Sequence, residues 1–139
     1  MRRRVVVTGF GCINPMGNDV ETMWTGLKQG RSGVRQITLF NARQMPTKIA
    51  AEIKNWDVSA IGEDPAQWSF RGRHSRFAAG AARQAIDSSG VLDGTLNPER
   101  FGVYLGSGEG NQDFPSFTRM MEAGLSTETL NVSRFIQAG

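Results

Sequence analysis

The stretch of sequence that decides the fold lies near the start of the chain and reads Arg3-Arg4-Val5-Val6-Val7-Thr8-Gly9-Phe10-Gly11. A short β-branched run that ends in a glycine-rich turn is typical of a strand covered on both faces, as in layered α/β proteins. The arginines at the start of the chain, followed by apolar residues, resemble a secretory signal peptide, but the apolar run is short and glycines interrupt it. We therefore expect a strand over residues 5–7 and a cytoplasmic protein in which Cys12 is a free, buried thiol.

A helix is predicted over residues 19–29. Asn18 is expected to cap it, because Glu21 follows three residues later in the capping-box position, and Gly30 is expected to end it. The apolar positions fall on a single helical face. They are Val20, Met23, Trp24 and Leu27.

A second helix is predicted over residues 71–89, with Gly90 as its stop. Its apolar face consists mostly of alanines, and small side chains let a helix lie close to a neighbouring element. Weaker patterns fill the remainder of the chain. They predict a surface connection over 31–46, strands over 47–53 and 101–105, a helical turn near 57–61, a turn at Asn97-Pro98, and a third helix over 113–123.

Composition excludes several classes of protein. The 139 residues suit one domain, and no apolar run approaches the roughly 20 residues that span a bilayer. A single cysteine and a single histidine exclude a disulfide framework and a cysteine-rich zinc site, and the dispersed acidic residues indicate no metal site. The formal net charge of +3 comes from scattered cations, so neither a nucleic-acid nor a membrane partner is expected.

Three local features could carry chemistry. Glycine-rich turns at residues 8–11 and 106–110 suggest a nucleotide-binding loop, but the alternative is that their glycines permit tight turns and close packing. Cys12 has no neighbouring base in the sequence, which argues against a nucleophile. Arg71, Arg73, His74 and Arg76 form a cationic cluster that suits an anionic partner; the alternative is a solvated face.

The order of the motifs resembles the amino-terminal part of the β-ketoacyl-acyl carrier protein synthases. The resemblance covers most of residues 2–110. The motifs that carry it are residues 3–11, Asn14-Pro15-Met16-Gly17-Asn18, the Trp24-containing helix with Gly30-Arg31-Ser32-Gly33-Val34, Ser75-Arg76-Phe77-Ala78, Ala81-Ala82-Arg83-Gln84-Ala85, and Phe101-Gly102-Val103-Tyr104-Leu105-Gly106-Ser107-Gly108.

The resemblance implies a thiolase-like fold, a mixed sheet with helices on its faces, and a homodimer or a heterodimer with a related synthase. It implies decarboxylative Claisen condensation in fatty acid or polyketide synthesis, without a cofactor. The family's catalytic residues lie after this region, so residues 1–139 are expected to be a truncated amino-terminal part, inactive alone. The resemblance also implies that Arg71 and Arg73 dock the acyl carrier protein. It places Gly108, Glu109 and Gly110 at the acyl pocket or dimer interface.

Two positions depart from the family pattern. Glu109 stands where the family commonly has an apolar residue, and Ser75 where it often has an acidic one. A carboxylate beside an alkyl chain is costly unless it is paired or exposed. These departures favour an alternative, a noncatalytic partner of the chain-length-factor type. A nucleotide-binding α/β module is a further alternative.

Overall fold

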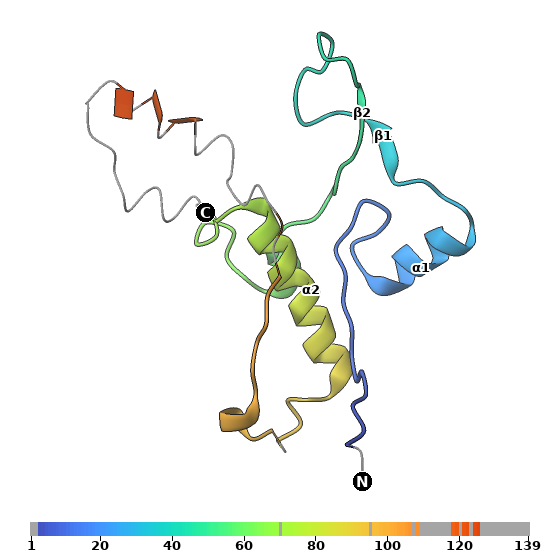
Figure 1. The fold of residues 1–139 in the computed structure, drawn as a ribbon, viewed down its shortest axis with the longest axis vertical. Coiled ribbons are helices and arrows are strands. Elements are labelled where there is room, and N and C mark those ends of the chain that lie inside the picture. Colours follow the sequence, from blue (N-terminus) through green and yellow to red (C-terminus); the bar gives the residue numbers. More distant parts are fainter. Residues whose placement is uncertain are drawn as a thin grey trace. The chain divides into compact units, whose positions relative to one another are not determined.

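A computed structural model describes residues 3–69, 71–94, 96–106 and 108, together with 118–119, 121–122 and 124–125 (Figure 1). The chain divides into two compact units. The first comprises Met1–Trp56 and Gly80–Thr95, and the second comprises Asp57–Ala79 and Leu96–Gly139.

Helix α1, Val20–Lys28, confirms the first predicted helix. Asp19, not Asn18, is its N-cap, because the Asp19 carboxylate accepts hydrogen bonds from the N–H (2.7 Å) and hydroxyl (2.8 Å) of Thr22. The expected cap was therefore wrong. The Asn18 amide instead donates to the carbonyls of Lys54 and Asn55.

Gly30 ends α1 as predicted, with a positive φ of 64° that suits glycine. Its N–H donates to the Leu27 carbonyl (3.0 Å), and the N–H of Arg31 donates to the Gly26 carbonyl (2.9 Å). These two bonds form a Schellman motif, which satisfies the last carbonyls of the helix.

Strands β1, Val34–Gln36, and β2, Ile49–Ala51, form a two-stranded antiparallel sheet in which Val34 pairs with Ala51. The N–H of Ile37 donates to the Lys48 carbonyl (2.9 Å) and continues the ladder by one bond. β2 confirms the strand predicted within 47–53. β1 corrects the expectation of a plain surface connection over 31–46; its three-residue strand is too short to leave a period in the sequence.

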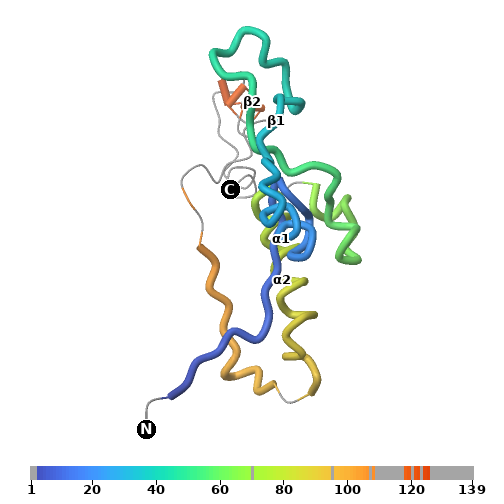
Figure 2. The backbone as a smooth tube through the Cα atoms, turned by 90° about the vertical axis from the view of Figure 1, so that its right-hand side faces the viewer, coloured from blue at the N-terminus to red at the C-terminus, as the bar shows by residue number. Residues whose placement is uncertain are grey.

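Helix α2, Arg73–Ser89, contributes residues 80–89 to the first unit, and the N-terminal segment of that unit lies beside this part of the helix (Figures 1 and 2). A methyl group added at Gly9 would overlap the Ala85 carbonyl, and one added at Gly11 would overlap the Ala81 carbonyl. Gly80 of α2 leaves similar room for Trp56, whose Cη2 would lie 2.9 Å from an added Cβ. The small face of α2 thus permits close packing, as the sequence predicts.

Residues 5–7 are not a strand. Val5 and Val7 are 94% and 82% exposed, and within the described ranges no segment pairs with them. A high β propensity does not by itself make a strand, because the backbone N–H and C=O groups of a strand need a hydrogen-bonded neighbouring strand.

In the second unit, the 3₁₀ helix η1, Val58–Ile61, confirms the predicted turn and buries Val58. A second 3₁₀ helix, η2, Pro98–Arg100, forms at the predicted Asn97-Pro98 turn, with Asn97 as its cap. The buried strand expected over 101–105 was wrong for the same reason as residues 5–7, since Tyr104 is 99% exposed. The third helix expected over 113–123 falls largely outside the described residues, although 118–119 and 121–122 are helical.

Among the described residues, no helix has the length and apolar character required to cross a lipid bilayer.

Candidate functional site

The cationic segment 71–76 lies at the N-terminus of α2, in the second unit. Helix N-termini carry a partial positive charge, and the first turn of α2 contains no acidic residue to offset it. Three arginines therefore add positive charge to a field that already favours anions. Arg71 and Arg73 are exposed, while His74 and Arg76 are half-buried.

Arg76 has a structural role within this segment. Its Nε donates to the Arg71 carbonyl (3.0 Å), and its Nη2 donates to the Ser69 carbonyl (3.1 Å). The guanidinium thus ties the incoming loop to the first turn of the helix. Arg71 and Arg73 are the exposed arginines of the segment, and their role in docking the carrier protein stays a prediction.

Arg73 lies over the ring of Phe77, with the guanidinium carbon 5.3 Å from the ring centre. This cation–π contact restricts the side chain to the surface of α2. A guanidinium donates hydrogen bonds in its own plane, so contact with a ring face is compatible with bonds to a carboxylate or phosphate. The cation–π contact thus does not prevent the in-plane donors of Arg73 from hydrogen bonding.

The second predicted site is described only in part. Gly108 is exposed, while Glu109 and Gly110 lie outside the described residues. The assignment of these three residues to an acyl pocket or dimer interface stays a prediction.

Cys12 is a free, half-buried thiol, and its Sγ lies 3.8 Å from the Met23 Sδ. Burial raises the pKa of Cys12, and the nearby charge of Asp19 raises it further, while a hydrogen bond with Asn14 lowers it in part. A raised pKa keeps the thiol protonated and unreactive. This environment agrees with the expectation that Cys12 is not the nucleophile.

The glycines of the first turn act in packing. Gly9 and Gly11 lie against the backbone of α2, where a side chain would collide with helix carbonyls. This contact supports the packing alternative over a phosphate loop for residues 8–11. Within the described ranges, no group of three or more His, Cys, Asp or Glu residues is arranged to hold a metal ion.

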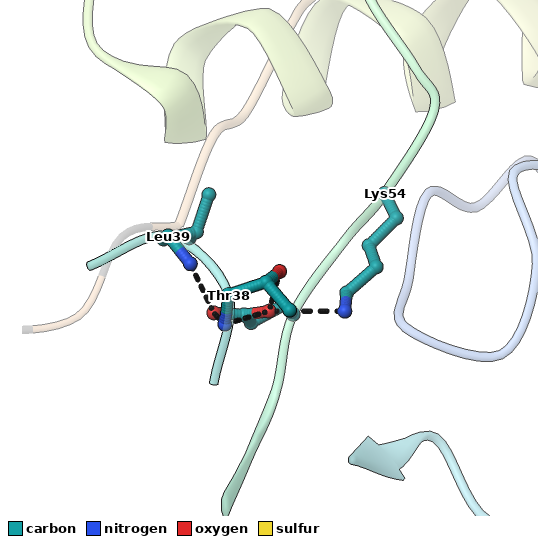
Figure 3. Close-up of polar contacts among 4 residues, drawn as sticks. Thr38, Leu39 and Lys54 are labelled. Atoms are coloured by element: carbon teal, nitrogen blue, oxygen red, sulfur yellow. Dashed lines mark hydrogen bonds and ion pairs between the residues drawn. The ribbon is translucent and has the colours of Figure 1, made fainter. Parts of the chain in front are cut away.

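Sequence reasoning missed one polar centre, the buried carboxylate of Glu52 just after β2. It accepts hydrogen bonds from the N–H (3.0 Å) and hydroxyl (2.8 Å) of Thr38 and from the N–H of Leu39 (3.1 Å), and Lys54 Nζ lies 3.2 Å away (Figure 3). Burial opposes the charge, but these partners outweigh it and lower the pKa of Glu52 to about 2. The only signal in the sequence was one acid among several cations over residues 34–54.

Comparison with known proteins identifies the family of this chain. The family model described as "Beta-ketoacyl synthase, N-terminal domain" matches residues 2–137. The 3-oxoacyl-[acyl-carrier-protein] synthase 2 of Coxiella burnetii is 38% identical over 138 residues, which is 99% of this chain and 33% of that protein. The tetracenomycin polyketide synthase ketoacyl synthase alpha subunit of Streptomyces glaucescens is 39% identical over 110 residues, 78% of this chain and 25% of that protein.

A solved structure supports the same conclusion. The ishigamide ketosynthase/chain length factor matches with a TM-score of 0.68 and 28% identity, over 100% of this chain and 34% of that one. The fold is therefore the amino-terminal part of a thiolase-like α/β fold, as the resemblance implied. The chain spans about a third or less of the length of these relatives. It belongs to the β-ketoacyl synthase family, and matches the N-terminal domain of that family along almost its whole length.

Proposed function

We propose that this chain is the amino-terminal part of a β-ketoacyl-acyl carrier protein synthase that performs decarboxylative condensation in fatty acid or polyketide synthesis. The carrying observation is the 38% identity to a 3-oxoacyl-[acyl-carrier-protein] synthase across 99% of the chain. In the proposed reaction, a cysteine of the remaining polypeptide holds the acyl group as a thioester. A malonyl thioester loses carbon dioxide, its carbanion attacks the acyl carbonyl, and the cysteine thiolate leaves.

Within this proposal, this part of the chain serves binding and not chemistry. Arg71 and Arg73 dock the acidic carrier protein at the N-terminus of α2, where the helix dipole and two exposed guanidiniums attract carboxylates and phosphates. Gly108, Glu109 and Gly110 border the acyl pocket or the dimer interface. We further propose that the intact protein works in the cytoplasm as a homodimer or as a heterodimer with a related synthase.

A second candidate is a noncatalytic partner of the chain-length-factor type. Glu109 favours it, because a carboxylate is a poor lining for an alkyl pocket. A match to a ketosynthase/chain length factor structure also supports this candidate. The polypeptide beyond residue 139 distinguishes the two: a cysteine in a strand-to-helix turn supports the synthase, and its replacement supports the partner.

The activity is tested on the intact protein that contains this chain. Incubation with an acyl donor and malonyl-carrier thioester should release carbon dioxide and yield a β-ketoacyl product. Absence of both products, alone and with a condensing partner, would reject the synthase assignment.

Carrier docking is tested separately, by calorimetric titration with carrier protein. Arg73→Glu should weaken binding by about tenfold or more, since it removes a charge-assisted contact and adds a repulsion. The loss should shrink at high salt because the contact is exposed. Arg83→Glu is the matched control; it makes the same charge change on α2, where Arg83 forms an exposed ion pair with Asp87. Equal affinities for the Arg73→Glu variant and the unsubstituted protein would contradict the docking assignment.

A further inference from the structure

The β1–β2 hairpin carries the charge excess of the chain. Residues 34–54 contain four cations and one acid, an excess of three that equals the formal net charge of the whole protein. The one acid is Glu52, whose carboxylate is bound by Thr38, Leu39 and Lys54. It therefore neutralises neither Arg43 nor Lys48, and the described residues place no carboxylate within ion-pair distance of these two.

A pocket of about 310 Å³ opens in the connection between β1 and β2 (teal in Figure 1). Arg43 and Lys48 supply its charge, Phe40 supplies an aromatic side chain, and Gln36, Ile37, Asn41 and Ala42 complete the lining. Its size is near the lower end of small-molecule sites, about 300–1,000 Å³. The lining contains cations, amides and apolar groups but no acid.

The frame of this pocket is held by hydrogen bonds. Glu52 fixes the backbone at Thr38 and Leu39, directly before the pocket residue Phe40. The N–H of Met45 donates to the carbonyl of the buried Ala42 (3.0 Å). The Asn41 side chain accepts from the N–H of Arg43 (3.2 Å), and the N–H of Ile37 donates to the Lys48 carbonyl (2.9 Å). A framework held in this way lowers the ordering cost of binding.

We propose that this pocket binds a small organic phosphate monoester. Arg43 would pair with two phosphate oxygens through its planar donors, and Lys48 would add a second positive charge. Phe40, which is 56% exposed, would contact the apolar part of the ligand. The site is distinct from the basic segment 71–76 and does not depend on condensing activity.

The test uses the intact protein at low ionic strength, titrated by calorimetry with phenyl phosphate and with inorganic phosphate. We expect saturable binding of phenyl phosphate that is tighter than binding of inorganic phosphate. Arg43→Gln and Lys48→Gln should each weaken it by about tenfold, the size of one charge-assisted hydrogen bond. Phe40→Ala should remove the preference for the phenyl compound and retain phosphate binding.

Two controls separate the pocket from general positive charge. Arg35→Gln removes a cation from the same hairpin that does not line the pocket, and Arg83→Gln removes an exposed cation from α2, outside the basic segment. Both should leave the affinity for phenyl phosphate unchanged. The proposal would be overturned if phenyl phosphate showed no saturable binding at millimolar concentration. It would also be overturned if the control variants lost as much affinity for phenyl phosphate as the pocket variants. Arg43 and Lys48 are exposed, so their variants are expected to fold.

Discussion

Gly11→Ala tests whether the N-terminal segment is packed against α2 as the structure has it. The added methyl group would overlap the Ala81 carbonyl and would lie 2.6 Å from Gln84 Cβ and 2.9 Å from the Ala85 nitrogen. Two of these atoms belong to the helix backbone, which cannot turn away as a flexible side chain can. The segment would have to withdraw from the helix.

The magnitude follows from three contributions. Forcing a methylene-sized group into a packed site costs about 1–3 kcal/mol. Withdrawal also breaks the hydrogen bond from the Cys12 N–H to Gln84 Oε1 (3.1 Å), worth about 1 kcal/mol. Replacing glycine by alanine restricts the unfolded chain and returns about 0.4–1 kcal/mol. The free energy of unfolding should therefore fall by roughly 1–3 kcal/mol.

The measurement is equilibrium denaturation of the intact protein, with Gly26→Ala as the matched control. Gly26 is buried, whereas Gly11 is half-buried, but the atoms nearest an added Cβ at Gly26 belong to the Arg31 guanidinium, the end of a flexible side chain. Alanine is also the better helix former by about 1 kcal/mol, so the control should be neutral or stabilising. If Gly11→Ala were as stable as the unsubstituted protein, or if both variants lost the same stability, the packing argument would be refuted.

Three further predictions concern polar side chains of the first unit. Glu52→Gln should lower the free energy of unfolding at neutral pH. The difference from the unsubstituted protein should disappear as the pH falls from about 4.5 to about 2. Although burial disfavours its charge, hydrogen bonds lower the pKa of Glu52 from 4.5 to about 2 in the folded protein. Its contribution to the free energy of unfolding is therefore fully present above pH 4.5 and is lost as the pH falls to about 2. A difference in stability that did not change with pH in a series of denaturation measurements would contradict this. Asp19→Ala should cost about 1 kcal/mol by loss of the α1 cap, seen as a lower denaturation midpoint, whereas Asn18→Ala should leave that cap in place. Cys12 should be alkylated slowly at pH 8, since burial raises its pKa, and peptide mass spectrometry that found it modified as fast as a free thiol would contradict the assignment.

The helices of this chain could be predicted because their signals are local. The apolar period and the stop at Gly30 located α1 to within a residue or two, and the small-residue face and Gly90 did the same for α2. The cap of α1 was misassigned by one position. Asn18 and Asp19 are both good capping residues, and the choice depended on the carbonyls of Lys54 and Asn55, which engage Asn18.

The strands could not be predicted as well because they require a partner from elsewhere in the chain. Residues 5–7 and 101–105 have strong β composition, yet the structure assigns neither as a strand. β1, which has a weak pattern, is a strand because β2 supplies its hydrogen bonds. The pocket of the hairpin was missed for a related reason: the residues that line it, between Gln36 and Lys48, come together only in the paired hairpin.

The amino-acid sequence by itself determined the family, the two helices and their stops, and the cationic segment at residues 71–76. Each of these depends on residues close together along the chain or on the order of motifs. Only the tertiary structure decided that Gly9 and Gly11 serve packing, that Arg76 anchors a loop while Arg71 and Arg73 keep the exposed charge, and that the hairpin acid is neutralised internally. These outcomes depend on which groups meet in space, because a hydrogen bond or a steric contact acts only over a few ångströms.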